Sequence, residues 1–363
     1  MLKCPFKVVT FLFLLTGCFQ ACNISRSEHN NLSSTDTLIR FTNPIAESAQ
    51  DPWIIKKDSF YYYCHTDKWN RLCVSKSRFL HKLGEDKVVW TTPDTGWNRN
   101  TVWAPELHSY NNKWYIYYAA GLSGPPFIYQ RSGVLESLTD DPQGAYIDKG
   151  ILNTGEDPND PTGTIWAIDF TISVINGKLY GAWSGWERNA DTDKTSQNIY
   201  IAEMSNPWTV SSERVKISAP DQSWETGGPL DLNEGPQFLK HNGHIFIIYS
   251  TRESWTPEYR LGQLTLKDST AALNSANWVK SGPVFQGTSD VVGTGHASFT
   301  TSMNGREWWI FYHSKKSYKP GWDRDLRLQK FTWNKDGSPN FGVPKKAGDT
   351  ISYWMSKSLL PVY

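Results

Sequence analysis

Residues 232–250 read LNEGPQFLKHNGHIFIIYS, and this stretch decides the fold. Glu234 stands at the head of one apolar run, Asn242-Gly243 follows as a turn, and a second apolar run ends in Tyr249. An Asn-Gly pair between two apolar runs is the strongest short-range signal of a β-hairpin. The backbone is fixed at Gly235 and Pro236, so the neighbouring carboxylate must point in a definite direction. We therefore predict a hairpin that carries a carboxylate at its head.

The same unit occurs four more times along the chain. The other heads are Asp51, Glu106, Asp169 and His296, and successive heads lie roughly 60 residues apart. The turns are residues 57–59, 111–112, 176–177 and 304–305, and the aromatic strands that follow them are residues 60–63, 114–118, 179–183 and 308–312. A near-constant period built only from strands is typical of propeller blades with about four strands each. The sequence predicts an all-β fold, a five-bladed β-propeller.

A propeller would bring the five heads together. The innermost strand of each blade lines the central channel, so equivalent positions in successive blades converge on one axis. Two aspartates, two glutamates and one histidine that lie far apart in the sequence would then surround a single pocket.

The first 40 residues are predicted to lie outside the propeller. Lys3 and Lys7 precede a short apolar segment, and residues 15–18 (Leu-Thr-Gly-Cys) resemble a bacterial lipobox. This pattern predicts a signal peptide at 1–17 and a lipid on the sulfur of Cys18; the alternative is an ordinary secretory signal with a chance cysteine. Residues 18–40 are rich in Ser, Asn and Thr and predict a flexible tether. We expect the propeller at 41–363 and an exported protein that faces the periplasm or the cell surface, with membrane contact only through the lipid.

Composition narrows the range of partners. The net charge is +1, with 37 basic and 36 acidic residues, so nothing indicates an electrostatic nucleic-acid partner. The chain holds 18 Trp, 17 Tyr and 16 Phe, an excess that suits both core packing and stacking on sugars.

Two further features leave alternatives open. Cys64 and Cys73 flank a predicted turn at 67–70; export permits a disulfide there, but cross-strand disulfides are geometrically demanding. The acids of the loop at 154–164 suit calcium ligands or, more simply, solvated turn residues.

The predicted ring of acids suits the hydrolysis of glycosides. That reaction needs one protonated and one ionised carboxyl group, which lie about 6.5–9.5 Å apart in inverting enzymes. Asp51 in blade one and Glu234 in blade four would face each other across the channel. Asp169 would raise the pKa of Glu234 through like-charge proximity and keep it protonated. Each acid alone is equally well explained as a strand-end cap or a surface charge.

Over residues 45–350 the chain resembles family 43 of the glycoside hydrolases. The motifs that carry the resemblance are Asp51-Pro52-Trp53 before Tyr61-Tyr62-Tyr63, Trp103-Ala104-Pro105-Glu106-Leu107 before Lys113-Trp114-Tyr115, Ile168-Asp169, Asn233-Glu234-Gly235-Pro236, and Gly295-His296. The resemblance implies a five-bladed propeller and inversion of configuration. It also implies that Asp51 is the general base, Glu234 the general acid, and Asp169 the residue that orients the acid and modulates its pKa.

The resemblance implies roles for other residues too. His296 would look down the channel and bind a calcium-centred water cluster, or be a hydrogen-bonded histidine without metal. Arg324 resembles the active-site arginine of the family, and such a cation would hold a substrate hydroxyl and tune Glu234, whereas we interpret Arg327 as structural. Trp103 would form a wall of the sugar pocket. The mechanism assigns no role to Glu106, which is expected to pack against a neighbouring blade or to form hydrogen bonds to it.

The substrate is predicted from the same resemblance. The motifs around Glu234 and His296, and residues 334–342, look most like the α-L-arabinofuranosidase branch, which releases terminal arabinofuranose from arabinan or arabinoxylan-type chains. Residues 254–259 depart from that pattern. A β-xylosidase, an endo-arabinanase and a non-catalytic carbohydrate-binding lipoprotein therefore remain alternatives.

Overall fold

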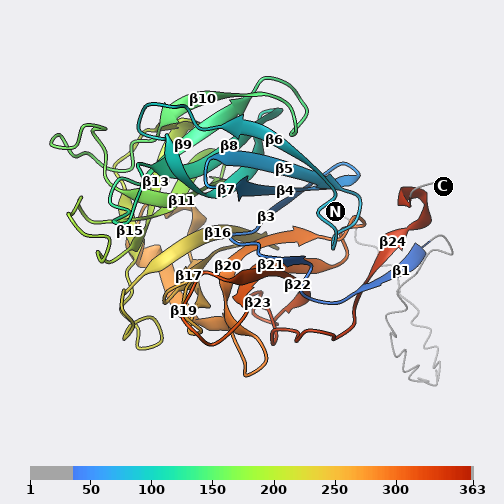
Figure 1. Cartoon of the computed structure of the whole chain (residues 1–363). Helices are drawn as coiled ribbons and strands as arrows, with labels where there is room; N and C mark the ends of the chain where they lie inside the picture. Colours follow the sequence, from blue (N-terminus) through green and yellow to red (C-terminus); the bar gives the residue numbers. More distant parts are fainter. Residues whose placement is uncertain (1–35, 361–363) are drawn as a thin grey trace, which may run out of the picture. The chain divides into compact units, whose positions relative to one another are not determined.

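Five antiparallel sheets follow one another along the chain, and each places one of the predicted heads at or beside its first strand (Figure 1). Blade one consists of β3 (Trp53–Lys57), β4 (Phe60–Asp67), β5 (Arg71–Ser77) and β6 (Glu85–Thr91). Blade two consists of β7 (Asn100–Tyr110), β8 (Lys113–Gly121), β9 (Arg131–Ser137) and β10 (Tyr146–Ile151). The computed structural model describes residues 36–360, and it confirms the five-bladed β-propeller.

The remaining blades repeat this order with small additions. Blade three consists of β11 (Ala167–Ile175), β12 (Lys178–Gly185), β13 (Asn198–Asn206), β14 (Thr209–Val210) and β15 (Val215–Ser218). Blade four consists of β16 (Asn233–His241), β17 (His244–Thr251), β18 (Arg260–Leu266) and β19 (Trp278–Gln286). Blade five consists of β20 (Val292–Thr301), β21 (Trp308–Lys315), β22 (Arg324–Trp333), β23 (Pro339–Asn340) and β2 (Ala46–Glu47). Three short 3₁₀ helices lie at Ser269–Ala271, Ser275–Asn277 and Lys357–Leu359.

The predicted hairpins are confirmed. The turns at 57–59, 111–112, 176–177, 242–243 and 304–305 each join the first two strands of a blade. In blade four, Asn242 and Gly243 have φ angles of 46° and 83°, the left-handed conformation that an Asn-Gly turn supplies. These turns fix the register of the hairpins, and therefore which side chains face the channel.

The core lies between the blades. Five clusters of buried apolar residues each join two neighbouring blades. Tyr62 of blade one packs with Trp114 of blade two, and Phe285 of blade four packs with Tyr312 of blade five. The aromatic strands predicted from sequence therefore serve mainly to pack the blades against one another.

The N-terminal part of the described chain closes the ring. Strand β2 pairs with β22 of blade five, although it precedes blade one in the sequence. Beside it, Asn43 Nδ2 donates to Leu328 O and Asn43 Oδ1 accepts from Leu328 N, both at 3.0 Å. Blade five is therefore completed by residues from the other end of the described chain.

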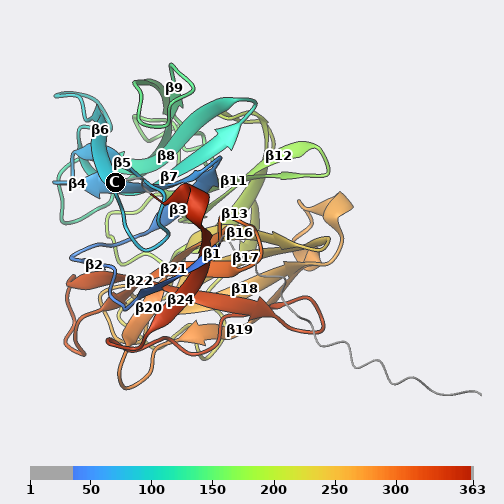
Figure 2. The ribbon, with the colours of Figure 1, turned by 90° about the vertical axis from the view of Figure 1, so that its right-hand side faces the viewer.

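The folded part begins before the predicted boundary at residue 41. Strand β1 (Asp36–Phe41) pairs along its whole length with β24 (Ile351–Ser356), and Figure 2 shows the two strands side by side. Ile39 and Phe41 are partly buried and pack against the cluster that contains Tyr353, so the apolar residues of 36–41 hold this segment on the propeller. Residues 1–35, which contain the predicted signal peptide and Cys18, lie outside the described residues. Within residues 36–360, no helix is both long enough and apolar enough to cross a membrane.

The inner strands are kinked where their heads lie. Asp51, Asp169 and His296 have φ angles of 47°, 56° and 47°, and Gly235 beside Glu234 has 56°. The pairing register shifts between Ile168 and Thr171, and similar shifts follow Glu234 and Gly295. Non-glycine residues seldom adopt this left-handed conformation, and bulges of this kind redirect side chains near functional sites.

The two cysteines of blade one lie on opposite faces of their sheet. Cys64 is paired with Val74 and Cys73 with His65, and consecutive residues of a strand point to opposite sides. Both thiols are buried and free. The disulfide that the sequence left open is absent from this structure because the register turns the two sulfur atoms away from each other.

Both thiols should therefore be recovered unmodified. After denaturation without reductant and alkylation, peptide mass spectrometry should show one alkyl group on Cys64 and one on Cys73. A sample that is reduced before alkylation serves as the control. A cross-linked peptide pair that disappears in the reduced sample would contradict the described register.

Candidate active site

Asp51 is surrounded by basic groups. Its Oδ1 lies 3.2 Å from Arg324 Nη1 and 3.5 Å from His296 Nδ1, and its backbone N–H donates to His313 Nδ1 at 3.2 Å. Burial by itself would raise the pKa of Asp51, but the charge of Arg324, followed by that of His296, outweighs burial and holds the pKa well below its usual range. Asp51 is therefore ionised at every working pH, as a general base requires.

Sequence reasoning missed two residues that hold this group. His313 lies opposite Gly295 in the pairing of β20 with β21; burial is the main cause that lowers its pKa to about 3, so the ring stays neutral and can accept the Asp51 N–H. Gln50 accepts a hydrogen bond from Arg324 Nη2. The sequence held one signal for His313: it is a single imidazole in an aromatic strand, and it lies opposite Gly295, next to the head of blade five.

Glu234 forms no ion pair with any cation of residues 36–360. It is 8% exposed, and its Oε1 accepts a hydrogen bond of 2.8 Å from the Tyr259 hydroxyl. Burial, with a further contribution from the charge of Asp51, raises the pKa of Glu234 to about 7, although the bond from Tyr259 acts in the opposite direction. The group thus keeps its proton up to near-neutral pH, as a general acid requires.

Tyr259 was also missed, and a glycine explains its position. A side chain on Gly295 would collide with the Tyr259 ring, since an added Cβ would lie 2.3 Å from two ring carbons. The Tyr259 ring also stacks on the His313 ring, with the two ring centroids 5.3 Å apart. Gly295 therefore admits the tyrosine that binds Glu234, and this close approach joins blades four and five at the site.

Asp169 holds the backbone beside the acid. Its Oδ2 accepts a hydrogen bond of 2.8 Å from Gly235 N, and burial is the main cause that raises the pKa of Asp169 to about 7. The structure thus places Asp169 where it can orient Glu234. The sequence predicted that the charge of Asp169 raises the pKa of Glu234. In the structure the main cause of that raised pKa is burial.

Glu106 links blades across the channel. Its Oε1 accepts a hydrogen bond from Gln237 of blade four, and its Oε2 lies 2.9 Å from Nε2 of His108. Burial raises the pKa of Glu106 to about 8 and lowers that of His108 to about 3. The pair is therefore neutral near pH 7, and Glu106 forms an interblade hydrogen bond, although its partner belongs to blade four and not to a blade next to its own.

Trp103 and Arg327 occupy contrasting environments. The Trp103 indole packs edge to face on Phe127 with centroids 4.9 Å apart, and its buried Nε1–H has no acceptor among the described residues. It adjoins the cluster that contains Ile168, next to Asp169. Arg327 Nε bonds to Ser314 and Asp325 and has the structural place that was expected.

Four loops, which we call the rim loops, surround the heads: residues 122–130, 186–197, 252–259 and 316–323. Each follows the second strand of a blade, at the end where the first strand begins, as the pairing of Glu234 with Ser250 shows. Phe127 N donates to Asp193 Oδ2 at 3.1 Å, and Gly321 N donates to Trp255 O at 2.9 Å. Neighbouring rim loops are thus bonded to each other.

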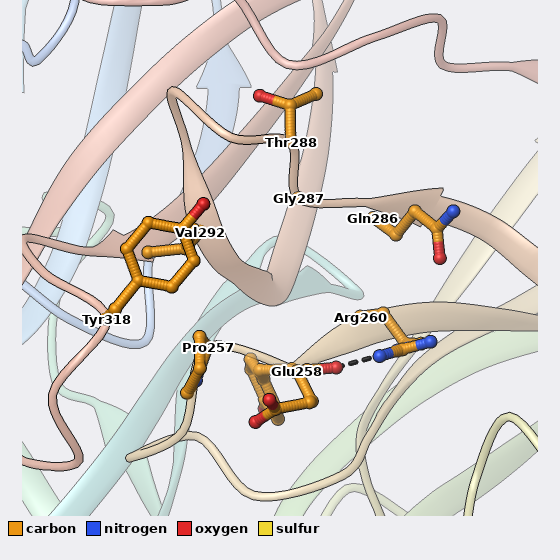
Figure 3. Close-up of a pocket in the computed structure, with 9 residues that line it drawn as sticks. Pro257, Glu258, Arg260, Gln286, Gly287, Thr288, Val292 and Tyr318 are labelled. Carbon is orange, nitrogen blue, oxygen red and sulfur yellow. Dashed lines mark hydrogen bonds between the residues drawn. The ribbon is translucent and has the colours of Figure 1, made fainter.

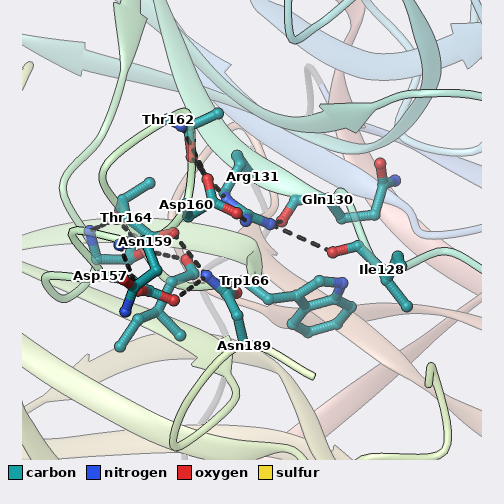
Figure 4. Close-up of polar contacts among 12 residues, drawn as sticks. Ile128, Gln130, Arg131, Asp157, Asn159, Asp160, Thr162, Thr164, Trp166 and Asn189 are labelled. Carbon is teal, nitrogen blue, oxygen red and sulfur yellow. Dashed lines mark hydrogen bonds and ion pairs between the residues drawn. The ribbon is translucent and has the colours of Figure 1, made fainter. Parts of the chain in front are cut away.

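The loop at 154–164 supports the rim. Trp166 Nε1 donates to Phe127 O at 2.8 Å, and Figure 4 shows Asp160 paired with Arg131 and Asp157 with Asn189. Asp157 and Asp160 therefore already bind protein donors, which favours the interpretation of this loop as turn structure rather than as a calcium site.

The described residues offer few metal ligands in the channel. Their single group of three or more His, Cys, Asp or Glu ligand atoms within 4.8 Å of one another is His65, Cys73 and Asp86 in blade one. Calcium prefers six to eight oxygen ligands, and no such set is gathered around His296 in the described part of the chain. The donor set does not fit a dedicated calcium site. Calcium held through water at His296 stays a prediction, and no chemical step below depends on it.

A separate surface hollow lies between blades four and five (Figure 3). It is lined by Pro257, Glu258, Tyr259, Arg260, Gln286, Gly287, Thr288, Val292 and Tyr318. The hollow shares Tyr259 with the surroundings of Glu234 but is lined by none of Asp51, Asp169 and Glu234.

Comparison with known proteins adds independent information. A profile of the family described as glycosyl hydrolases family 43 matches residues 41–339. The extracellular exo-α-(1→5)-L-arabinofuranosidase of Streptomyces avermitilis is 37% identical over 86% of this chain, and this chain spans about 65% of the length of that protein. The α-L-arabinofuranosidase 43 of Humicola insolens is 32% identical over 94% of this chain and 69% of its own length. The crystal structure of an α-L-arabinofuranosidase from Lactobacillus brevis has a TM-score of 0.76 and 31% identity, and it covers 85% of this chain and 98% of its own.

Removing the Tyr259 hydroxyl should move the basic limb of the pH–rate profile. The hydroxyl stabilises the ionised form of Glu234, so Tyr259→Phe should raise the pKa of Glu234 above about 7 and preserve the protonated acid at higher pH. The expected displacement of the limb is about one pH unit. It is measured as kcat/KM against pH with α-1,5-arabino-oligosaccharides, whose sugar leaving group must be protonated.

Tyr249→Phe is the matched control, because the Tyr249 hydroxyl donates to Glu225 and not to any of the three acids. The control should leave the limb in place. A basic limb that stays at the wild-type pH in Tyr259→Phe, or moves to lower pH, would contradict the assignment of Glu234 as the group that titrates there.

Proposed function

The chain belongs to family 43 of the glycosyl hydrolases, and from this premise we propose that it is an inverting, exo-acting α-L-arabinofuranosidase. Its substrates would be arabinan or arabinoxylan-type polysaccharides and oligosaccharides, from which it releases terminal arabinofuranose. One observation carries the chemical part of the proposal: Arg324 Nη1 lies 3.2 Å from Asp51 Oδ1, whereas Glu234 Oε1 accepts a hydrogen bond from the Tyr259 hydroxyl. The cation holds the pKa of Asp51 well below its usual range, and burial raises the pKa of Glu234 to about 7, which is the combination of base and acid that this reaction needs.

The proposed reaction uses these groups in one displacement. Asp51 takes a proton from a water molecule as the water oxygen attacks the anomeric carbon. The bond from that carbon to the leaving oxygen breaks, and Glu234 donates its proton to the leaving oxygen. Through Gly235, Asp169 keeps the acid in position. Asp51 and Glu234 share no hydrogen bond in the described part of the chain, as expected when a water molecule must fit between them.

The position of Arg324 modifies the role expected from sequence. Its Nη1 contacts Asp51 and not Glu234, so its main effect is to keep the base ionised. Its buried Nε–H has no partner among the described residues, and neither has the Nε1–H of Trp103. We propose that both donors bind hydroxyl groups of the terminal sugar, with His296 beside them.

The linked rim loops favour exo action. One hydrogen bond joins loops 122–130 and 186–197, and another joins loops 252–259 and 316–323, which supports a channel mouth with restricted access. A restricted pocket admits a chain end, whereas an endo-arabinanase must accept the middle of a chain. The relatives named as arabinofuranosidases support the proposed sugar over xylose.

We also propose that the protein is exported and anchored through Cys18. The Streptomyces avermitilis relative is named as extracellular, which supports export. The anchor is supported by the lipobox-like residues 15–18 alone.

Replacing the general acid should abolish turnover of natural substrates. Glu234→Gln keeps the shape of the side chain but has no proton to donate, so we expect kcat/KM on α-1,5-arabino-oligosaccharides to fall by about 10²–10⁴. With wild type, proton NMR at early times should show the β-anomer of arabinose as the first product, with no oligosaccharide released from within the chain. Initial release of the α-anomer would contradict inversion, and a mixture of oligosaccharides would contradict exo action.

Lipidation is tested separately on the full chain. Cells with bacterial lipoprotein processing and fed labelled palmitate should incorporate the label and place the protein in the membrane fraction. Cys18→Ser should lose the label and leave the membrane, whereas the control Cys22→Ser should keep both. Label that persists in Cys18→Ser, or is absent from wild type, would overturn the anchor.

A further inference from the structure

Trp322 is a large apolar side chain left in the open beside the catalytic residues. It is 57% exposed, it lies in the rim loop 316–323, and it precedes Arg324 by two residues. The Arg324 guanidinium lies over the Trp322 ring at 5.4 Å and contacts Asp51 at 3.2 Å. One side chain thus separates this exposed indole from the proposed general base.

Trp322 does not stand alone. Its ring lies 5.2 Å from that of Trp255, tilted by 49°, and Trp255 comes from the rim loop of blade four. The ammonium group of Lys194, from the rim loop of blade three, lies 5.8 Å from the Trp255 ring. Three blades therefore contribute to one aromatic and cationic surface, which we call the mouth platform and define as Lys194, Trp255 and Trp322.

The mouth platform is held in place before any ligand binds. Gly321 N donates to Trp255 O at 2.9 Å, and Lys315 Nζ donates to Gly321 O at 2.6 Å. In the same loop, the Tyr318 hydroxyl donates to Ser289 O at 3.2 Å, at the edge of the hollow in Figure 3. Such bonds reduce the conformational entropy that a ligand must remove when it binds.

We propose that the mouth platform is a binding site for the leaving part of the substrate, and that it stacks a pentosyl residue on the free face of Trp322. This inference rests on the proposed function. The terminal sugar occupies the channel between Asp51 and Glu234, so the chain beyond the scissile bond must leave through the mouth. The electron-rich face of an indole attracts the polarised C–H groups of a sugar ring. The ammonium group of Lys194 can donate hydrogen bonds to the hydroxyl groups of that sugar. The exposure of Trp322 is then explained, since a large apolar surface near a polar site marks a ligand contact.

The test compares variants on α-1,5-arabinotriose. Trp322→Ala should raise KM for arabinotriose about tenfold, the amount expected for the loss of one aromatic contact. It should change kcat much less, because the leaving chain is held equally in the ground state and the transition state. Trp322→Phe should restore most of the wild-type KM. Trp322→Leu keeps an apolar side chain without a π-face and should resemble Trp322→Ala.

Trp354→Ala is the control. Trp354 is a half-buried indole of β24, which pairs with β1 outside the five blades, and its ring stacks on no other ring in the described part of the chain. Its replacement should leave KM for arabinotriose unchanged. An unchanged KM in Trp322→Ala, or an equal rise in Trp354→Ala, would overturn the mouth platform.

Failure of the proposed function gives a different result. If wild type does not cleave arabinotriose, the proposed activity is wrong. The mouth platform is then tested by itself, by calorimetric measurement of arabinotriose binding to wild type and to Trp322→Ala. Weaker binding by Trp322→Ala supports the platform, whereas equal binding, or no binding to wild type, overturns it.

Discussion

The contact between Arg324 and Asp51 is the interaction on which the chemistry of this channel depends. Burial raises the pKa of every carboxyl group that the blades bring there, and without a cation all of them would tend to be protonated together. Arg324 breaks this symmetry because it contacts Asp51 and not Glu234. The proposed base and the proposed acid therefore differ mainly in the groups that lie beside them. An isolated buried charge is costly, and the paired guanidinium is what makes an ionised Asp51 tolerable in this position.

The backbone supplies a second constraint. Asp51, Asp169 and His296 all adopt the left-handed conformation, which is unfavourable for residues other than glycine. A regular strand would alternate its side chains between the two faces of the blade and would place few of them along the axis. The kinks direct these side chains into the channel, and the packed cores between the blades hold them there. Backbone strain at the heads is thus part of how five ordinary sheets make one site.

The sequence revealed the parts of this arrangement that repeat. Turn chemistry and aromatic strands recur in every blade, so the five hairpins, the propeller and the heads such as Glu234 could be predicted. Tyr259 and His313 could not, because each is one aromatic or imidazole ring among many and gains its role only from the register that brings it to an acid. The strand at 36–41 was missed because its partner lies some 300 residues away in the sequence, at Ile351–Ser356, and no local pattern announces such a pairing.

Asp51 and Arg324 also lie where the pairing of β2 with β22 closes the ring of blades. Strand β2 pairs Glu47 with Asp325, so the chain that leads to Asp51 and the strand that begins at Arg324 are held together by backbone hydrogen bonds. The closure that completes blade five therefore also holds the chain on either side of the contact between Asp51 and Arg324. Because β22 begins at Arg324 and β2 ends shortly before Asp51, the pairing that closes the ring brings the proposed base next to the cation that lowers its pKa.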